Sequence, residues 1–250
     1  MGLFRKSGPS AAVKVPSAPE GCRIYAVGDV HGCLAELDSL LGRIEADCSA
    51  YAGATHLVFV GDLVDRGPDS AGVVRRLRLG PLPCERQSFI MGNHEEAMIA
   101  VYEGELESLS GWLTYGGAET LESYGLDRTE VFRLGQNLPR RMQAAIPQED
   151  VAFIRSFKDK VSLGDYLFVH AGVRPGVPLS EQQANDLRWI RSEFLDDDET
   201  DHGAVIVHGH TICEEPEVRT NRIGIDTGCY SSGRLTALVL EGTNRRFLTN

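Results

Sequence analysis

The chain has 250 residues, of which 42% are hydrophobic, so it is long and apolar enough for one domain with a sizeable core. Its formal net charge of −11 argues against sequence-independent binding to nucleic acid, which requires a basic surface. No apolar run approaches the roughly 18 residues that a membrane-spanning helix needs. Six scattered cysteines form no C-x-x-C pair and the N-terminus has no apolar signal segment, so we expect reduced thiols and a cytoplasmic protein.

The predicted elements begin after a segment rich in Pro, Ser, Ala and Lys. We expect residues 1–20 to form a flexible tail and 21–250 to form one folded domain. Helical spacing of apolar residues separates the early strand-like runs, and this alternation predicts an α/β core. The predicted strands are 24–27, 57–60, 88–91, 166–169, 204–207, 222–225 and 235–240.

A long helical stretch follows the third predicted strand. From about residue 95 to residue 157 the pattern is almost wholly helical, and the last of these helices begins near Pro147. The final third of the chain returns to strands, and the sequence SLGDYLFV predicts a hairpin that turns at Gly164 and Asp165. The sequence contains no internal repeat and no linker to a second domain.

Polar side chains of the kinds that bind metals follow five of the predicted strands. Open α/β sheets place their ligands beyond the carboxyl ends of the strands, so we expect these side chains to meet at one edge. Core packing does not explain this placement. The residues are Asp29 and His31 after the first strand, Asp62, Asp65 and Arg66 after the second, Asn93 and His94 after the third, His170 after the fourth, and His208 and His210 after the fifth.

This set of ligands is too large for one ion and predicts two. Oxygen and imidazole ligands without thiolate suit manganese, which we expect first, or iron, zinc or nickel. Two divalent ions about 3.5–4 Å apart favour in-line displacement at phosphorus. The predicted ligands are Asp29, His31 and Asp62 for the first ion, and Asn93, His170 and His210 for the second, with Asp62 shared between them.

The expected charge of this site suits a phosphate group. Two divalent ions, the carboxylates of Asp29 and Asp62, and a bridging hydroxide leave a net charge of about +1. Arg66 adds a forked donor that fits phosphate oxygens. An acidic chain can therefore attract a phosphate dianion at this point.

The motifs that carry these residues resemble those of the metallophosphoesterase superfamily. They are most similar to its phosphoprotein phosphatase branch, which includes calcineurin and the bacteriophage lambda phosphatase. GDVHG, GDLVDRG, GNHE, HAG and GHT occur in this order, with WLTYGG, WIR and IDTG, between about residues 23 and 240. Each motif alone is weak, but five in order are specific. The resemblance implies a calcineurin-like four-layer α/β/β/α sandwich with two mixed β-sheets and a mostly helical insert.

The resemblance also implies roles for single residues. It implies the same two sets of metal ligands and in-line attack by a hydroxide that bridges the ions. His94 matches the proton donor to the leaving oxygen, and Asp65 matches the carboxylate that orients it. Arg66 and Arg191, the latter in WIR, match phosphate clamps.

Several substrates are compatible with these motifs. We expect a serine/threonine protein phosphatase acting on phosphorylated protein or a small phosphate ester, because GNHE favours that branch over an aspartate-ended version. The alternative is a dinucleoside polyphosphate hydrolase of the diadenosine tetraphosphate type, whose motifs are nearly the same. A phosphodiesterase is disfavoured because Ile212 stands where GHxH places a histidine. An inactive scaffold is disfavoured because every expected ligand is present.

Four further residues have two interpretations each. His208 lies two positions before His210 on an extended chain, so it either supports the site from behind or acts as a ligand. Tyr230 follows IDTG and is a candidate for the substrate cleft. Cys33 and Cys213 lie near the histidine motifs, but a small buried hydrophobic role is favoured over metal binding.

Overall fold

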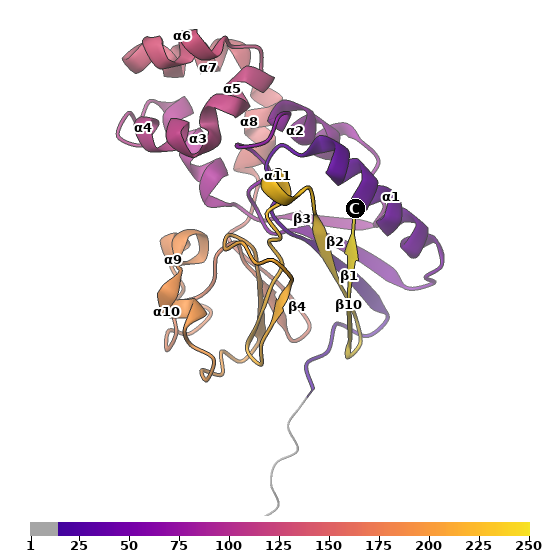
Figure 1. The fold of residues 1–250 in the computed structure, drawn as a ribbon. Coiled ribbons are helices and arrows are strands. Elements are labelled where there is room, and N and C mark those ends of the chain that lie inside the picture. Colours follow the sequence, from indigo (N-terminus) through magenta and orange to yellow (C-terminus); the bar gives the residue numbers. More distant parts are fainter. Residues whose placement is uncertain (1–14) are drawn as a thin grey trace, which may run out of the picture.

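The computed structural model describes residues 15–250, which form two five-stranded sheets with helices outside them (Figure 1). The first sheet contains β10 (Asn244–Thr249), β9 (Thr236–Glu241), β1 (Cys22–Val27), β2 (Ala54–Phe59) and β3 (Arg86–Phe89), in this order across the sheet. The second contains β4 (Val161–Leu163), β5 (Tyr166–Phe168), β6 (Val205–His208), β8 (Arg222–Gly224) and β7 (Glu217–Val218). The strands β1, β2 and β3 run parallel, as do β5, β6 and β8. The pairings β1–β9, β9–β10, β4–β5 and β7–β8 are antiparallel.

The two sheets pack face to face, which confirms the predicted four-layer α/β/β/α sandwich. Alternate residues of a strand point to opposite faces. In β1, Ile24 and Ala26 therefore enter the core between the sheets, while Tyr25 and Val27 enter the core beneath the helices. Because both faces of each sheet are buried, the strands read as continuous apolar runs rather than alternating ones.

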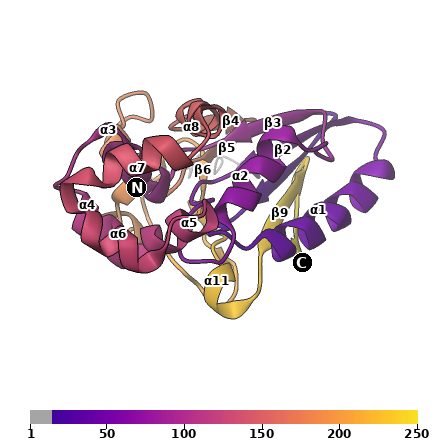
Figure 2. The same cartoon turned by 90° about the horizontal axis from the view of Figure 1, so that it is seen from above.

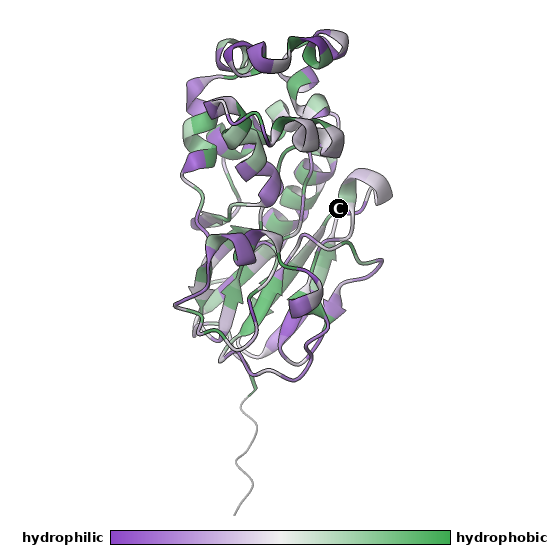
Figure 3. Cartoon of the chain, turned by 90° about the vertical axis from the view of Figure 1, so that its left-hand side faces the viewer, coloured by the Kyte–Doolittle hydropathy of each residue, from purple (hydrophilic) through white to green (hydrophobic). Residues whose placement is uncertain are grey.

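Helices cover the outer face of each sheet. The first sheet carries α1 (Leu34–Ser49) and α2 (Ser70–Leu79), seen from above in Figure 2. The second sheet carries α9 (Ala184–Trp189) and α10 (Ser192–Leu195). Figure 3 shows hydrophobic residues gathered on the strands, whereas the helices carry both kinds of residue. None of the helices described in 15–250 combines the length and apolar character that crossing a membrane requires.

The predicted helical insert is confirmed and stands above the first sheet in Figure 1. The short helix α11 (Cys229–Ser232) is not part of the insert and lies between β8 and β9. The insert contains α3 (Asn93–Glu103), α4 (Leu109–Trp112), the π-helical turn η1 (Leu113–Gly117), α5 (Ala118–Ser123), α6 (Arg128–Leu134), the 3₁₀ turn η2 (Gly135–Asn137), α7 (Leu138–Ala145) and α8 (Gln148–Arg155).

A glycine lets the insert approach the loop after β2. Gly116 in η1 has φ of 115°, and a Cβ placed there would lie 2.4 Å from the backbone nitrogen of Arg66. The Arg66 N–H donates to the Gly116 carbonyl at 3.2 Å. A larger residue would therefore push the insert away from this loop.

The expected hairpin at Gly164 and Asp165 is present, since Leu163 pairs with Tyr166 across the turn. One predicted strand needs correction, and two strands were missed. The third strand is Arg86–Phe89 rather than 88–91, and the strands β7 and β10 were not predicted. Both missed strands lie at sheet edges, where solvent-facing residues interrupt the apolar pattern on which the prediction depended.

Part of the predicted flexible tail, 15–20, lies among the described residues, and Ser17 and Ala18 make hydrogen bonds with the folded domain. Ala18 is buried, and its N–H donates to the Gly242 carbonyl at 2.8 Å. The Ser17 N–H donates to Asp165 Oδ2 at 2.9 Å, and the Asp165 N–H donates to the Ser17 carbonyl at 3.0 Å. Residues 17 and 18 therefore join the β9–β10 turn to the β4–β5 hairpin. The remainder of the expected tail, 1–14, lies outside the described residues.

Candidate functional site

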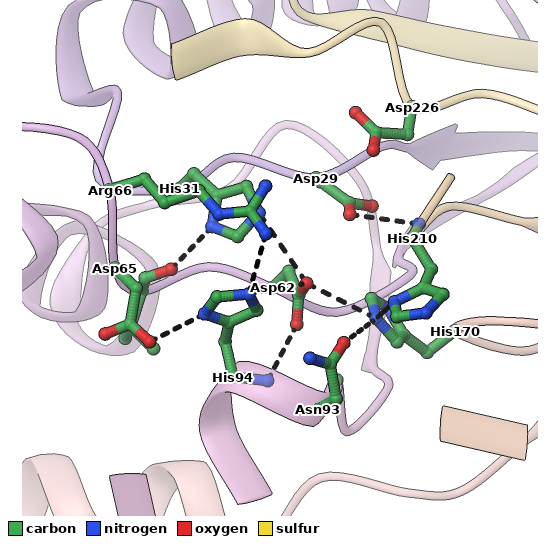
Figure 4. Close-up of polar contacts among 12 residues, drawn as sticks. Asp29, His31, Asp62, Asp65, Arg66, Asn93, His94, His170, His210 and Asp226 are labelled. Carbon is green, nitrogen blue, oxygen red and sulfur yellow. Dashed lines mark hydrogen bonds and ion pairs between the residues drawn. The ribbon is translucent and has the colours of Figure 1, made fainter. Parts of the chain in front are cut away.

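The polar residues that the sequence singled out meet at the carboxyl ends of the parallel strands of both sheets (Figure 4). Each loop delivers one to three side chains to the same point. Asp29 and His31 follow β1, Asp62, Asp65 and Arg66 follow β2, Asn93 and His94 begin α3 after β3, His170 follows β5, His210 follows β6, and Asp226 follows β8.

The backbone at this point is held in a sparsely populated conformation. Left-handed φ values are uncommon outside glycine and cost of order 1–3 kcal/mol each, so they persist only where the surroundings impose them. The backbone N–H groups of Val30 and His31 both donate to the Asp62 carbonyl, at 3.0 and 2.9 Å, which ties two of the strained loops together. Within 15–250 the non-glycine residues with positive φ are His31, Asp62, Asp65, Arg66 and His210, and all belong to the predicted site.

A buried carboxylate supports the loop after β2. Glu95 accepts hydrogen bonds from the backbone N–H groups of Asp62, Leu63 and Val64, at 2.8, 2.7 and 3.2 Å, and from that of Gly92 at 3.0 Å. Burial and the nearby Asp62 charge raise the pKa of Glu95 to about 7. The sequence analysis quoted Glu95 as the end of GNHE but gave it no structural role.

The histidine rings are oriented by backbone carbonyls. His31 Nδ1 donates to the Val64 carbonyl at 2.8 Å, and His170 Nδ1 donates to the Val60 carbonyl at 2.9 Å. Metal-binding histidines commonly donate their second ring N–H in this way, which leaves Nε2 as the ligand atom. In both rings Nε2 faces Asp62 Oδ2, at 3.6 Å from His31 and 3.3 Å from His170.

Several candidate ligand atoms lie close together, and two of them have no hydrogen-bond partner among the described residues. His170 Nε2 lies 2.8 Å from Asn93 Oδ1 and 3.2 Å from His210 Nδ1. Asp29 Oδ2 accepts from the His210 N–H at 3.0 Å, while Asp29 Oδ1 and His210 Nε2 are buried without a hydrogen-bond partner among the described residues. Buried lone pairs that face one another are unfavourable unless a cation lies between them.

The protonation states also suit metal binding. Burial lowers the pKa of His31 to about 3 and that of His210 to about 2, so both rings are neutral and have a lone pair to offer. Burial raises the pKa of Asp29 well above its usual value, and the charges of Asp226 and Asp62 raise it further. Two divalent ions would relieve this repulsion among buried carboxylates, so the donor set fits them.

The grouping of ligand atoms differs in one respect from the sequence prediction. Asp62, His170 and His210 offer atoms within 4.8 Å of one another, as predicted for one ion. His31, Asp62 and His94 also offer ligand atoms within 4.8 Å of one another. The prediction for the other ion named Asp29 in place of His94, and Asp29 lies outside this group. Asp62 belongs to both groups, and its position between two ions stays a prediction.

His94 is held by a buried hydrogen-bond chain. Its Nδ1 donates to Asp65 Oδ2 at 2.7 Å, and the same oxygen accepts from Trp112 Nε1 at 2.8 Å. Asp65 Oδ1 accepts from the Thr120 hydroxyl at 2.6 Å. Burial lowers the pKa of His94, but the Asp62 and Asp65 carboxylates outweigh burial and the net pKa is raised. Trp112 and Thr120 were not predicted as site residues, although Trp112 begins the quoted WLTYGG motif.

Two arginines lie at the site, Arg66 in the loop after β2 and Arg191 between α9 and α10. The Arg66 guanidinium lies 3.1 Å from His94 Nε2 through Nη2 and stacks 4.9 Å from the centre of the Tyr230 ring. Tyr230 also meets the His31 ring edge-on at 5.5 Å, which places it at the site as the sequence suggested. Arg191 lines the same cavity as Arg66 and His94, and its charge lowers the pKa of His210, after burial and His170.

The remaining candidates lie behind the cluster. His208 is buried, meets the Phe194 ring edge-on at 5.2 Å and belongs to neither group of ligand atoms. Asp226, quoted in IDTG without a role, lies beside Asp29, and its Oδ1 accepts from the Gly228 N–H at 2.8 Å (Figure 4). Cys33 is buried and Cys213 is partly buried, and Cys33 groups with Glu36 and Cys229 rather than with the histidines.

A sandwich of two sheets that gathers buried Asp, Asn and His ligands beside arginines defines a metal-dependent phosphoesterase. The family model described as calcineurin-like phosphoesterase matches residues 22–231, and the chain therefore belongs to this family. The family assignment confirms the resemblance carried by GDVHG, GDLVDRG and GNHE.

Relatives extend over most of the chain. The asymmetrical bis(5'-nucleosyl)-tetraphosphatase PrpE of Oceanobacillus iheyensis is 27% identical over 235 residues, covering 86% of this chain and 87% of the relative. The symmetrical bis(5'-nucleosyl)-tetraphosphatase of Janthinobacterium sp. is 27% identical over 266 residues, covering 86% and 92%. A solved structure of a candidate diadenosine tetraphosphatase has a TM-score of 0.62 at 24% identity, covering 93% of this chain and 96% of that one. A cold-active protein-tyrosine phosphatase of a Shewanella species has a TM-score of 0.55 at 19% identity, covering 95% and 85%, and shares the fold.

Proposed function

We propose that this chain hydrolyses dinucleoside polyphosphates of the bis(5'-nucleosyl) tetraphosphate type, with two divalent ions, manganese first among them. The observation that carries this proposal is that both the asymmetrical and the symmetrical relatives have this activity in their names and align over 86% of the chain. The clustered Asp, Asn and His ligands support the phosphoesterase chemistry, and the relatives support the substrate class.

The sequence argument for a protein phosphatase depended on the glutamate of GNHE. Glu95 is fully buried and binds the backbone of residues 62–64, so it does not face the substrate. Its identity therefore says little about the substrate, and the alternative named in the sequence analysis becomes the better-supported function.

Each residue then has a role derived from its place. When bound, the two ions would lower the pKa of water and polarise a phosphate oxygen. Asp29, His31 and Asp62 would hold one ion, and Asp62, Asn93, His170 and His210 the other. His94, oriented by Asp65, stands where it can protonate a leaving oxygen. Arg66 and Arg191 would bind phosphate oxygens and orient the chain of phosphates.

A comparison of substrates tests the proposal. Purified protein with manganese is given diadenosine tetraphosphate, a phosphoserine peptide and a bis-aryl phosphodiester, and kcat/KM is measured for each. We expect diadenosine tetraphosphate to exceed the other two by more than about tenfold. The Asp62→Asn variant, purified in the same way, should lose the activity and so assigns it to this centre. Faster hydrolysis of the phosphopeptide would contradict the proposal.

A further inference from the structure

A cavity of about 770 Å³ begins at the candidate metal centre and follows α3. Asn93, His94 and His210 line its inner end, and Glu103 and Glu105 line it at the far end of the helix. The 11 residues of α3 at 1.5 Å per residue separate these ends by about 15 Å. The cavity is therefore long enough to hold part of a substrate beyond the phosphate at the metals.

Two exposed aromatic side chains stand on different walls of this cavity. Trp189, at the end of α9, is 43% exposed, and Tyr115, in η1 beside α4, is 66% exposed. Large aromatic side chains at this level of exposure leave a ring face open to a ligand. The floor between them contains the small side chains of Ala97 and Ala100 on α3, which leave room for a flat ring.

The Trp189 ring is held in place by α3. Its Nε1 donates to Glu96 Oε2, and the neighbouring Arg188 binds Glu96 Oε1 and Asp159. The only polar atom of the indole is thereby satisfied, and the ring edge is fixed while the side chain remains partly exposed. Such an arrangement is a preorganised stacking surface.

The charges along the cavity change sign with distance from the metals. Arg66 and Arg191 line the inner part, and Glu103 and Glu105 line the far part. A polyphosphate is attracted to the inner part and repelled from the far part. A nucleoside base, which is flat, uncharged and carries N–H donors, suits the region beyond the arginines.

On the basis of the proposed function, we infer that this cavity binds one nucleoside end of the dinucleoside polyphosphate, with the base stacked on the Trp189 indole and Tyr115 beside it. Stacking on an aromatic ring accepts any base, because every base has a π face. The site thus recognises the nucleoside class and distinguishes it from a bare phosphate chain.

The test compares a substrate with nucleosides and one without. We measure kcat/KM on diadenosine tetraphosphate and on inorganic tetraphosphate for Trp189→Leu, Trp189→Phe and Tyr115→Leu. Trp189→Leu should lower kcat/KM on diadenosine tetraphosphate about 10–100-fold, since one stacked base accounts for a loss of this size. It should leave kcat/KM on inorganic tetraphosphate within about threefold of the wild-type value. Trp189→Phe keeps a ring and should retain most of the activity. Phe132→Leu, an exposed aromatic on α6 away from the cavity, is the matched control.

Binding is read independently of catalysis by fluorescence. The chain has two tryptophans, so AMP added to protein kept in excess chelator should quench the Trp189 part of the emission. Trp189→Phe should lose most of this quenching, because its remaining tryptophan, Trp112, lines the same cavity but is only 3% exposed.

The outcomes separate the two proposals. Suppose that wild-type protein cleaves diadenosine tetraphosphate, but that Trp189→Leu and Tyr115→Leu each lower kcat/KM equally on diadenosine tetraphosphate and on inorganic tetraphosphate. The nucleoside site is then refuted and the proposed function stands. If wild-type protein cleaves inorganic tetraphosphate or phosphopeptide but not diadenosine tetraphosphate, the proposed function itself fails. An unchanged kcat/KM on diadenosine tetraphosphate in Trp189→Leu would also overturn the inference.

Discussion

The orientation of His94 bears on its proposed role as a proton donor. It is tied to Asp65 through Nδ1, so its Nε2 is directed toward Arg66 and the cavity. A proton donor matters most when the leaving oxygen is strongly basic. In a polyphosphate the leaving group is itself a phosphate, whose last pKa is about 6, and it departs without much help. The expected importance of His94 therefore depends on the substrate.

We predict that His94→Asn lowers turnover of phenyl phosphate by about 10²–10⁴-fold but lowers turnover of nitrophenyl phosphate and diadenosine tetraphosphate far less. Rates on the three substrates are compared in one preparation. Metal content is measured in the same samples to show that the ligands are undisturbed. Equal losses on all three would mean that His94 positions the phosphoryl group rather than donating a proton.

The identities of the site residues could be predicted from the sequence, but their backbone conformation could not. Asp29, His31 and Asp62 follow apolar runs, and that order is visible in one dimension. Asp62 has a left-handed φ, and its N–H group donates to Glu95, thirty-three positions away. A contact of this kind requires β2 and β3 to be neighbours, which a local pattern does not specify.

At the scale of elements, a charge cluster away from the site joins α1 to the first sheet. Asp47 in the last turn of α1 accepts from the Tyr25 hydroxyl and the Arg246 guanidinium, both at 2.5 Å, and from Arg23 at 3.1 Å. Burial raises the pKa of Asp47, but hydrogen bonds from Tyr25 and Arg246 outweigh it and hold the pKa below its usual value. Its carboxylate is thus more stable in the folded state than in the unfolded chain.

We predict that Asp47→Asn lowers the free energy of unfolding by about 1–2 kcal/mol near pH 7. Because the folded-state pKa is depressed, this stabilisation is present above the unfolded value of about 3.9 and is lost as the pH falls through the folded-state pKa. Urea unfolding of both proteins at several pH values measures the difference.

The control is Asp38→Asn on the same helix, because the Asp38 side chain is 50% exposed, against 25% for Asp47, and pairs with Arg76 alone among the described residues. This variant should change stability little at any pH. A difference between wild type and Asp47→Asn that stays constant down to pH 2 would contradict the assignment of the charge cluster.

At the scale of the whole molecule, the predicted architecture follows from burial on both faces of each sheet. Strands such as β1 and β2 each contain an apolar run, Ile24–Val27 and Leu57–Phe59, so their existence could be predicted from the sequence. The edge strand β10 has mostly half-exposed residues, so its sequence lacks the apolar run that predicts a strand. Ser17 and Ala18 lie in a segment rich in Pro, Ser and Ala, which likewise shows no strand or helix pattern. Long-range hydrogen bonds to the β4–β5 hairpin and the β9–β10 turn order that segment instead.

Both sheets contribute candidate metal ligands, so the proposed two-ion centre would be a property of the assembled sandwich. Its most direct test is the rate of diadenosine tetraphosphate hydrolysis measured against the manganese bound per chain, starting from protein stripped by a chelator. The two groups of ligand atoms that share Asp62 predict no turnover without metal and a maximum when two ions are bound. Full turnover in metal-stripped protein held in excess chelator would contradict the account.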